Sequence, residues 1–147
     1  MNHTHIKCQK PTGAFVGASW ISLFVGMGAY LIGLWNSDLG LSEKGYYFTV
    51  LLYGLFSAIS LQKNVRDRMD GISVTNIYYG LSWFSLMISI LLLGIGVWNS
   101  TMLPSEKGFY AMSFILSLFS AITIQKNIRD LALFPQEDRV TEIEENS

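Results

Sequence analysis

The sequence is poor in the residues that carry catalytic chemistry. It has one cysteine, Cys8, and two histidines, His3 and His5, all near the N-terminus. A lone cysteine forms no disulfide within the chain, and no nucleophile has a histidine base to accompany it along the rest of the sequence. Glycine-rich phosphate loops and zinc-ligand spacings are missing too. We therefore expect no catalytic residue, no cofactor and no metal site, and a protein that is not an enzyme.

Charge is missing from four long stretches of the chain. All 21 charged residues lie outside residues 11–37, 45–62, 71–105 and 108–125. A helix rises about 1.5 Å per residue, so even a stretch of 18 residues reaches roughly 27 Å, close to the thickness of the bilayer core. A soluble helix keeps one polar face. The stretches therefore predict an all-α membrane protein with four transmembrane helices.

The first charge-free stretch resembles a signal peptide. It is too long for one and lacks a cleavage site, so we expect it in the mature protein.

The chain also repeats itself at an offset of 63 residues. Residues 17–67 align with residues 80–130 without a gap, and about half of the pairs are identical. The longest shared blocks are Trp-Asn-Ser at 35–37 and 98–100, Ser-Glu-Lys-Gly at 42–45 and 105–108, Phe-Ser-Ala-Ile at 56–59 and 119–122, and Gln-Lys-Asn-x-Arg-Asp at 62–67 and 125–130. Each repeat holds two predicted helices, so the chain crosses the membrane twice in one repeat and returns to the side on which it started. The second repeat then begins on the same side as the first. We therefore predict two parallel-oriented two-helix repeats, related by a pseudo-two-fold axis along the membrane normal.

Composition divides the chain into five segments. These are an N-terminal tail at 1–12, a first two-helix transmembrane repeat at 13–67, a linker at 68–75, a second two-helix transmembrane repeat at 76–130, and an acidic tail at 131–147. The acidic tail is rich in glutamate, and we expect it to be disordered. His3 could ligate Cu(II) or Ni(II) together with a free amino terminus, but a plain polar tail is the simpler interpretation.

Basic residues indicate how the chain lies across the membrane. The two tails, the linker and the adjoining ends of the second helices share one side, which holds eight of the ten lysines and arginines, whereas the other side carries only Lys44 and Lys107. The positive-inside rule then places both termini in the cytoplasm. The two outer loops are short hairpin connections, and Ser42 and Ser105 suit the N-caps of the helices that follow. A ligand site in these loops is the alternative.

The Gln-Lys-Asn-x-Arg-Asp block lies where the second helix of each repeat leaves the membrane. Its cations are candidate contacts for anionic lipid headgroups or a protein partner: Lys63, Arg66, Lys126 and Arg129. Arg66 and Arg129 could together hold one phosphate-like anion. Lys63 and Asp67 are spaced to pair along one helix face, as are their counterparts in the second repeat. The alternative is that these basic residues only set the orientation of the chain in the membrane. That role would not require the Gln, Asn and Asp of the block.

Two functions remain open from the residues alone. The first is a non-enzymatic membrane protein that acts through anionic lipids, a protein partner or a second copy of itself. The alternative is a small oligomeric channel or transporter, with hydroxyls such as those of Ser57 and Ser120 lining a path. Transporters usually carry an ionisable residue within a span, and these spans have none. The basic residues are few and lie at the lipid boundary, which does not support nucleic-acid binding.

The repeated blocks resemble those of the YiaA/YiaB family of bacterial inner membrane proteins. The resemblance covers about residues 11–135, in two copies of a two-helix domain. It implies a multi-pass protein of the bacterial inner membrane. It implies no activity, cofactor or catalytic residue.

Overall fold

The computed structural model describes residues 10–145, with side chains as far as residue 133. Within that part the chain forms four helices and no strand. They are α1 (Gly13–Asn36), α2 (Leu41–Met69), α3 (Asn76–Asn99) and α4 (Pro104–Glu145). The prediction of an all-α protein with two helices per repeat is confirmed. His3 and Cys8 lie outside the described residues, so the interpretations placed on them stay predictions.

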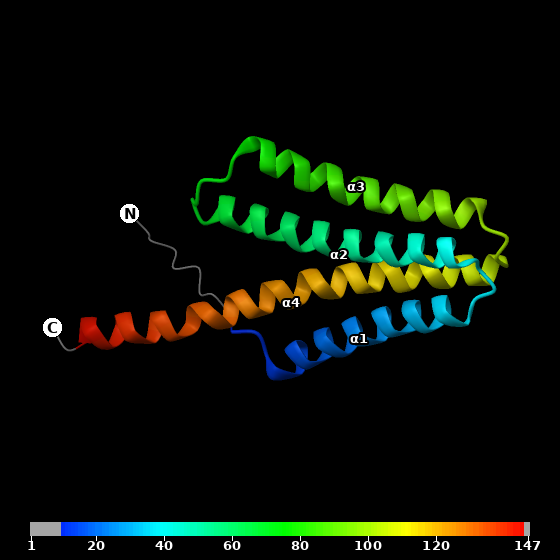
Figure 1. Cartoon of the computed structure of the whole chain (residues 1–147). Coiled ribbons are helices and arrows are strands. Elements are labelled where there is room, and N and C mark those ends of the chain that lie inside the picture. The colour runs from blue at the N-terminus through cyan, green and yellow to red at the C-terminus, as the bar shows by residue number, and fades with distance from the viewer. Residues whose placement is uncertain (1–9, 146–147) are drawn as a thin grey trace.

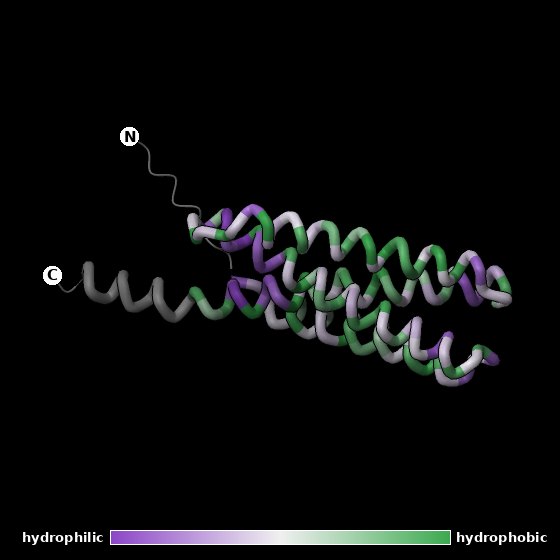
Figure 2. Tube along the Cα trace, turned by 45° about the horizontal axis from the view of Figure 1, so that its top comes forward, coloured by the Kyte–Doolittle hydropathy of each residue, from purple (hydrophilic) through white to green (hydrophobic). Residues whose placement is uncertain are grey.

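Three of the helices are long and apolar enough to cross a membrane by themselves: Gly13–Asn36, Asn76–Asn99 and Pro104–Leu133. The fourth, α2, is less apolar and lies between α3 and α4 (Figure 1). A helix that packs between neighbours needs less apolar surface than one that faces lipid on most sides. Figure 2 shows hydrophobic residues along the middle of the bundle and hydrophilic residues gathered at both ends.

The helices pack across the repeats rather than within them. The main partner of α1 is α4 and that of α3 is α2, while α2 and α4 meet at the centre. The two helices of one repeat contact each other only slightly. Figure 1 shows the resulting order, α3, α2, α4, α1, with α1 parallel to α3 and α2 parallel to α4. A two-fold rotation exchanges the repeats and maps the α1–α4 pair onto the α3–α2 pair, so neither repeat is a compact unit.

Small residues allow the closest approaches between helices. A Cβ added at Gly54 of α2 would lie 2.6 Å from the ring of Phe114 in α4. One added at Gly26 of α1 would lie 2.8 Å from Oγ of Ser117 in α4. Such contacts are typical of membrane helices, where small residues bring backbones together. Through these positions α4 contacts both α1 and α2, and the hydrophobic core draws most of its buried side chains from α2 and α4.

The starts of α2 and α4 differ from the prediction. Ser42 and Ser105 lie inside the first turns and are not N-caps. The backbone N–H of Gly40 donates to the Glu43 carboxylate over 2.8 Å, and that of Leu103 donates to Glu106 over 2.8 Å. A glutamate three residues into a helix can reach back to the N-cap amide, so the cap is supplied by the acidic residue and not by the serine.

The end of α4 also differs from the expectation of a disordered acidic tail. The helix continues past the second repeat to Glu145. Once a helix is nucleated, each further residue adds a hydrogen bond at little cost, and glutamate is a good helix former. The segment therefore extends beyond the rest of the bundle, as Figure 1 shows.

Candidate functional site at the ends of α2 and α4

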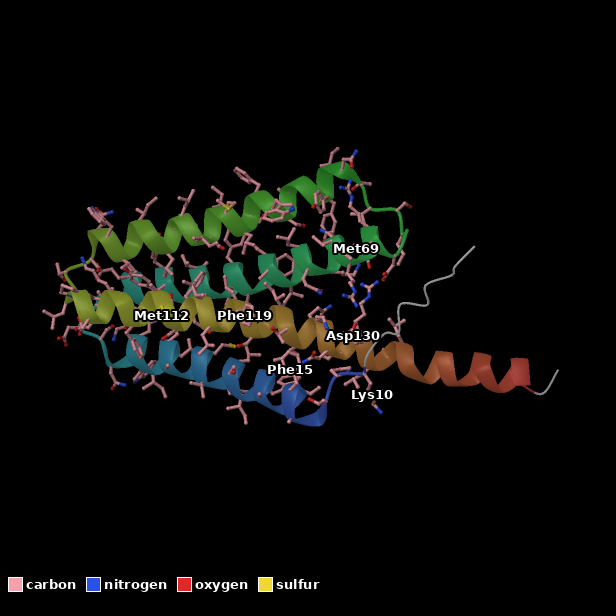
Figure 3. The ribbon with its side chains drawn as sticks, turned by 180° about the vertical axis from the view of Figure 1, so that it is seen from behind. Lys10, Phe15, Met69, Met112, Phe119 and Asp130 are labelled. Carbon is pink, nitrogen blue, oxygen red and sulfur yellow. The ribbon has the colours of Figure 1, made fainter. Side chains whose placement is uncertain are left out.

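The two copies of the Gln-Lys-Asn-x-Arg-Asp block lie at the same end of the bundle. One copy ends α2, and the other lies on α4 beside it. Figure 3 shows Met69 of α2 and Asp130 of α4 at this end, with Met112 toward the other. We call the ionic side chains gathered here the charged cluster: Lys63, Arg66, Asp67, Asp70, Lys126, Arg129 and Asp130.

Each arginine of the block pairs with the aspartate of the other repeat. Nη2 of Arg66 lies 2.6 Å from Oδ1 of Asp130, and Nη1 of Arg129 lies 2.9 Å from Oδ1 of Asp67. The Asp130 side chain is 4% exposed and the Asp67 side chain 11%. The two contacts are exchanged by the pseudo-two-fold rotation. They join α2 to α4 at this end of the bundle.

Each aspartate is also bound by a lysine of its own helix. Nζ of Lys63 lies 3.0 Å from Asp67, and Nζ of Lys126 lies 2.7 Å from Asp130. This confirms the pairing predicted from the spacing. The lysine side chains are 60% and 49% exposed, so much of each faces outward. Hydrogen bonds from Lys63 and then from Arg129 hold the pKa of the Asp67 carboxyl below its usual range, which keeps the carboxylate ionised.

Two buried asparagines extend the same symmetry to the outer helices. Nδ2 of Asn64 in α2 donates to Oγ of Ser82 in α3 over 2.6 Å, and Nδ2 of Asn127 in α4 donates to Oγ of Ser19 in α1 over 3.2 Å. A buried amide requires such partners, because leaving it unpaired is costly. The sequence reasoning missed these serines. Their identity at equivalent positions of the two repeats is the signal that could have found them.

The charged cluster is not fully symmetric. Nη2 of Arg129 donates to Asp70, so Arg129 has two acidic partners. The position equivalent to Asp70 in the second repeat is Leu133. Arg66 therefore uses one terminal nitrogen on Asp130, and no second acidic partner is present for it among the described residues.

The structure brings the four predicted cations into this one cluster. The guanidinium groups of Arg66 and Arg129 each lie against an aspartate of the opposite repeat. Their joint binding of an anion is therefore not required to explain their presence, and it stays a prediction. A nearby cation, Arg68, lies over the ring of Tyr79 at 4.2 Å from the centroid and donates to Asn76 of α3.

The outer blocks form a second repeated arrangement at the opposite end. Nζ of Lys44 donates to the carbonyl of Trp35 over 2.9 Å, and Lys107 donates to Trp98 over 3.3 Å. These bonds cap the first helix of each repeat and so support the hairpin interpretation. Two equivalent hollows, of about 320 and 330 Å³, lie between the end of each first helix and the start of the other repeat's second helix. They contain Glu106 and Glu43 respectively. No group of three metal-ligating side chains occurs among the residues that were described.

Fold and cluster together define an all-helical membrane protein built from a duplicated two-helix unit. The chain belongs to the YiaA/YiaB family, because the yiaA/B two helix domain matches it twice, at residues 15–67 and 78–130. The predicted resemblance is confirmed.

Relatives give the same assignment. The chain is 54% identical over 139 residues to the inner membrane protein YiaA of Escherichia coli, covering 94% of this chain and 96% of that protein. It is 31% identical over 101 residues to the inner membrane protein YiaB of the same organism, covering 68% and 85%. The uncharacterized membrane protein YubF of Bacillus subtilis is 38% identical over 63 residues, covering 42% of this chain and 72% of YubF. No solved structure matches the chain.

Proposed function

We propose that this is a non-enzymatic, multi-pass protein of the bacterial inner membrane that acts by binding anionic lipid headgroups, or an acidic protein partner, at the charged cluster. All four helices cross the membrane, and both termini lie in the cytoplasm. Relatives named as inner membrane proteins support the location. The excess of basic residues at the end that holds the cluster supports the orientation.

The observation that carries the proposal is that the side chains of Lys63 and Lys126 are exposed although each is paired with an aspartate. The carboxylates of Asp67 and Asp130 are already neutralised by arginines, yet Lys63 and Lys126 add a second cation to each and remain about half exposed. The cluster therefore keeps a positive surface at the level of lipid phosphates. Basic residues at that level attract anionic headgroups at about 1 kcal/mol each.

Native mass spectrometry of gently extracted protein tests the proposal. The variant Lys63→Gln plus Lys126→Gln removes the exposed charges and leaves each aspartate with its arginine. We expect it to lose co-purifying anionic lipid or an acidic partner. The matched control is Lys44→Gln plus Lys107→Gln at the opposite end. If the Lys63→Gln plus Lys126→Gln variant retains the same bound lipids and partners as the unaltered protein, and its melting temperature is unchanged, the proposal is wrong.

A comparison of the inner arginines with the outer lysines extends this test. Arg66→Ala plus Arg129→Ala should affect ligand retention or phenotype more than Lys44→Ala plus Lys107→Ala. Because these arginines also join the repeats, correct folding of both variants has to be verified first. Greater sensitivity of the outer lysine pair would place the site at the other side of the membrane.

A small oligomeric channel or transporter is the second candidate. The observation in its favour is Oγ of Ser120, which is buried and has no hydrogen-bond partner among the described residues. Its counterpart Ser57 instead donates to the carbonyl of Tyr53 in its own helix, over 2.7 Å. Solute flux into liposomes that is abolished by Ser57→Ala plus Ser120→Ala would favour this candidate. Absence of flux from well-folded protein would count against it.

A further inference from the structure

An apolar groove runs between α3 and α4 on the outside of the bundle. It has a volume of about 430 Å³ and lies in the membrane-spanning part of both helices. Leu93 and Gly94 of α3 and Phe114 of α4 line its middle, while Phe119 and Ile122 line it toward the charged cluster. Figure 3 shows Phe119 on α4 between Met112 and Asp130.

The groove is deepened by three residues that are smaller than their counterparts in the first repeat. Leu93, Gly94 and Ala111 line it, and the first repeat has Tyr30, Leu31 and Phe48 at the equivalent positions. A Cβ added at Gly94 would meet no atom within 4 Å. The two repeats keep their end blocks nearly identical but differ in side-chain volume along this groove.

A second hollow, at the charged cluster, adjoins the groove. That hollow has a volume of about 270 Å³ and shares Ile122 with the groove. Its lining includes Arg66, Gln62 and Trp83. Among the residues with described side chains, Arg66 has a single acidic partner, so several of its N–H donors are left over there.

We propose that the groove and the adjoining hollow together bind one anionic phospholipid of the cytoplasmic leaflet. One acyl chain lies between α3 and α4, and the phosphate accepts hydrogen bonds from Arg66. Phosphatidylglycerol is a lipid of this class, because its headgroup adds no positive charge to the phosphate. The assignment deepens the proposed function and rests on it, because it names the lipid class and the place where it is held.

Shape and charge favour a lipid over a helix of another copy. Membrane helices associate through small residues that let backbones approach. Here the borders of the groove carry large side chains, Ile90 of α3 and Ile115 and Phe119 of α4, which would hold a second helix away. A flexible chain needs only the space between them. The guanidinium at one end has N–H donors beyond those used on Asp130 and complements a phosphate, whereas an apolar helix would offer it no second anion.

Filling the groove with the first repeat's own residue tests the assignment. We would reconstitute the full chain in nanodiscs of phosphatidylcholine with phosphatidylglycerol and count retained lipids by native mass spectrometry. The unaltered protein should hold one phosphatidylglycerol per chain in preference to phosphatidylcholine. Gly94→Leu should lower that occupancy at least fivefold, and Ala111→Phe should do the same from the opposite wall. Gly28→Leu is the control, because Gly28 is also a helix glycine with open space around it.

The outcomes separate this inference from the broader proposal. Unchanged occupancy in both Gly94→Leu and Ala111→Phe overturns the groove assignment, even if Lys63→Gln plus Lys126→Gln releases lipid elsewhere. Loss in the groove variants with no loss in the lysine variant supports the groove and contradicts the role of the exposed lysines. If the groove variants abolish a dimer while lipid occupancy is unchanged, the occupant is a second copy and the assignment is wrong.

Discussion

Arg66 and Asp130 form an ion pair of 2.6 Å between the two repeats, although 64 positions separate them in the chain. The reciprocal pair of Arg129 with Asp67 measures 2.9 Å. Each aspartate side chain is nearly buried. Such a pair contributes little to stability when intact, but loss of one partner leaves the other charged and poorly solvated. The cross-repeat pairs therefore secure the relative position of α2 and α4.

Arg66→Ala should destabilise the fold by about 2 kcal/mol, because it leaves Asp130 with only its exposed lysine. The measurement is reversible unfolding in detergent micelles, followed by circular dichroism. Lys63→Ala is the matched control, and it should cost about 0.5 kcal/mol, as expected for an exposed pair along one helix. Adding Asp130→Ala to Arg66→Ala should cost less than the sum of the single changes. Strict additivity would show that the two side chains are not coupled.

Gly54→Ala should lower the melting temperature, because the added Cβ would stand 2.6 Å from the Phe114 ring. Overpacking of this kind typically costs about 1–3 kcal/mol. Gly28→Ala is the control, since open space surrounds Gly28 and alanine favours a helix. Adding Phe114→Leu should recover part of the loss at Gly54. A Gly54→Ala protein as stable as the unaltered one would mean that α2 and α4 are not so close.

Acidification should weaken the charged cluster. The pKa of Asp67 is lowered from 3.8 in the folded protein, so the folded state binds its proton less tightly than the unfolded state does. The stability that Asp67 contributes is then fully present above about pH 4 and is lost as pH falls through the lower folded pKa. We expect the free energy of unfolding to fall in that window, and to fall less in Asp67→Asn. An identical pH dependence in the variant would exclude Asp67 as the group responsible.

A fluorescent reporter fused after α4 should be active in the cytoplasm, because the proposed topology places both termini there. A periplasmic phosphatase fused within the loop between α1 and α2, at Asp38, should be active instead. The same phosphatase within the linker at Ser73 should be inactive. If the same reporter is active both at Asp38 and at the C-terminus, these two positions lie on the same side of the membrane. That result would contradict four crossings and would indicate that α2 lies outside the membrane.

The sequence predicted the features that depend on spacing along one chain. The offset of 63 residues indicated the pseudo-two-fold arrangement. The spacing of Lys63 and Asp67 predicted their pairing, which a 3.6-residue turn makes local. Gly54 and Ala58 are small residues four positions apart, a spacing typical of close helix packing, and Gly54 lies where α2 packs against Phe114 of α4.

Features that depend on which helices meet could not be read from spacing. The packing of α2 on α4 places an aspartate of the opposite repeat against Arg66 and against Arg129, which spacing within one helix does not predict. The partner of Asn127 likewise lies in α1, far away in the sequence. The cap at Gly40 was missed for a different reason: Ser42 and Glu43 are both good capping residues, and only the backbone decides which one reaches the free amide.

The interlaced packing of the helices has a consequence for biosynthesis. α1 is the first helix to leave the ribosome, but its main partner, α4, is the last. The hairpin of α1 and α2 that enters the membrane first has few contacts of its own. α1 must therefore remain in the bilayer without its partner until translation of residues 104–133 is complete. Insertion of α1 therefore precedes its packing, and most of the native contacts of this helix form only after the chain is nearly finished.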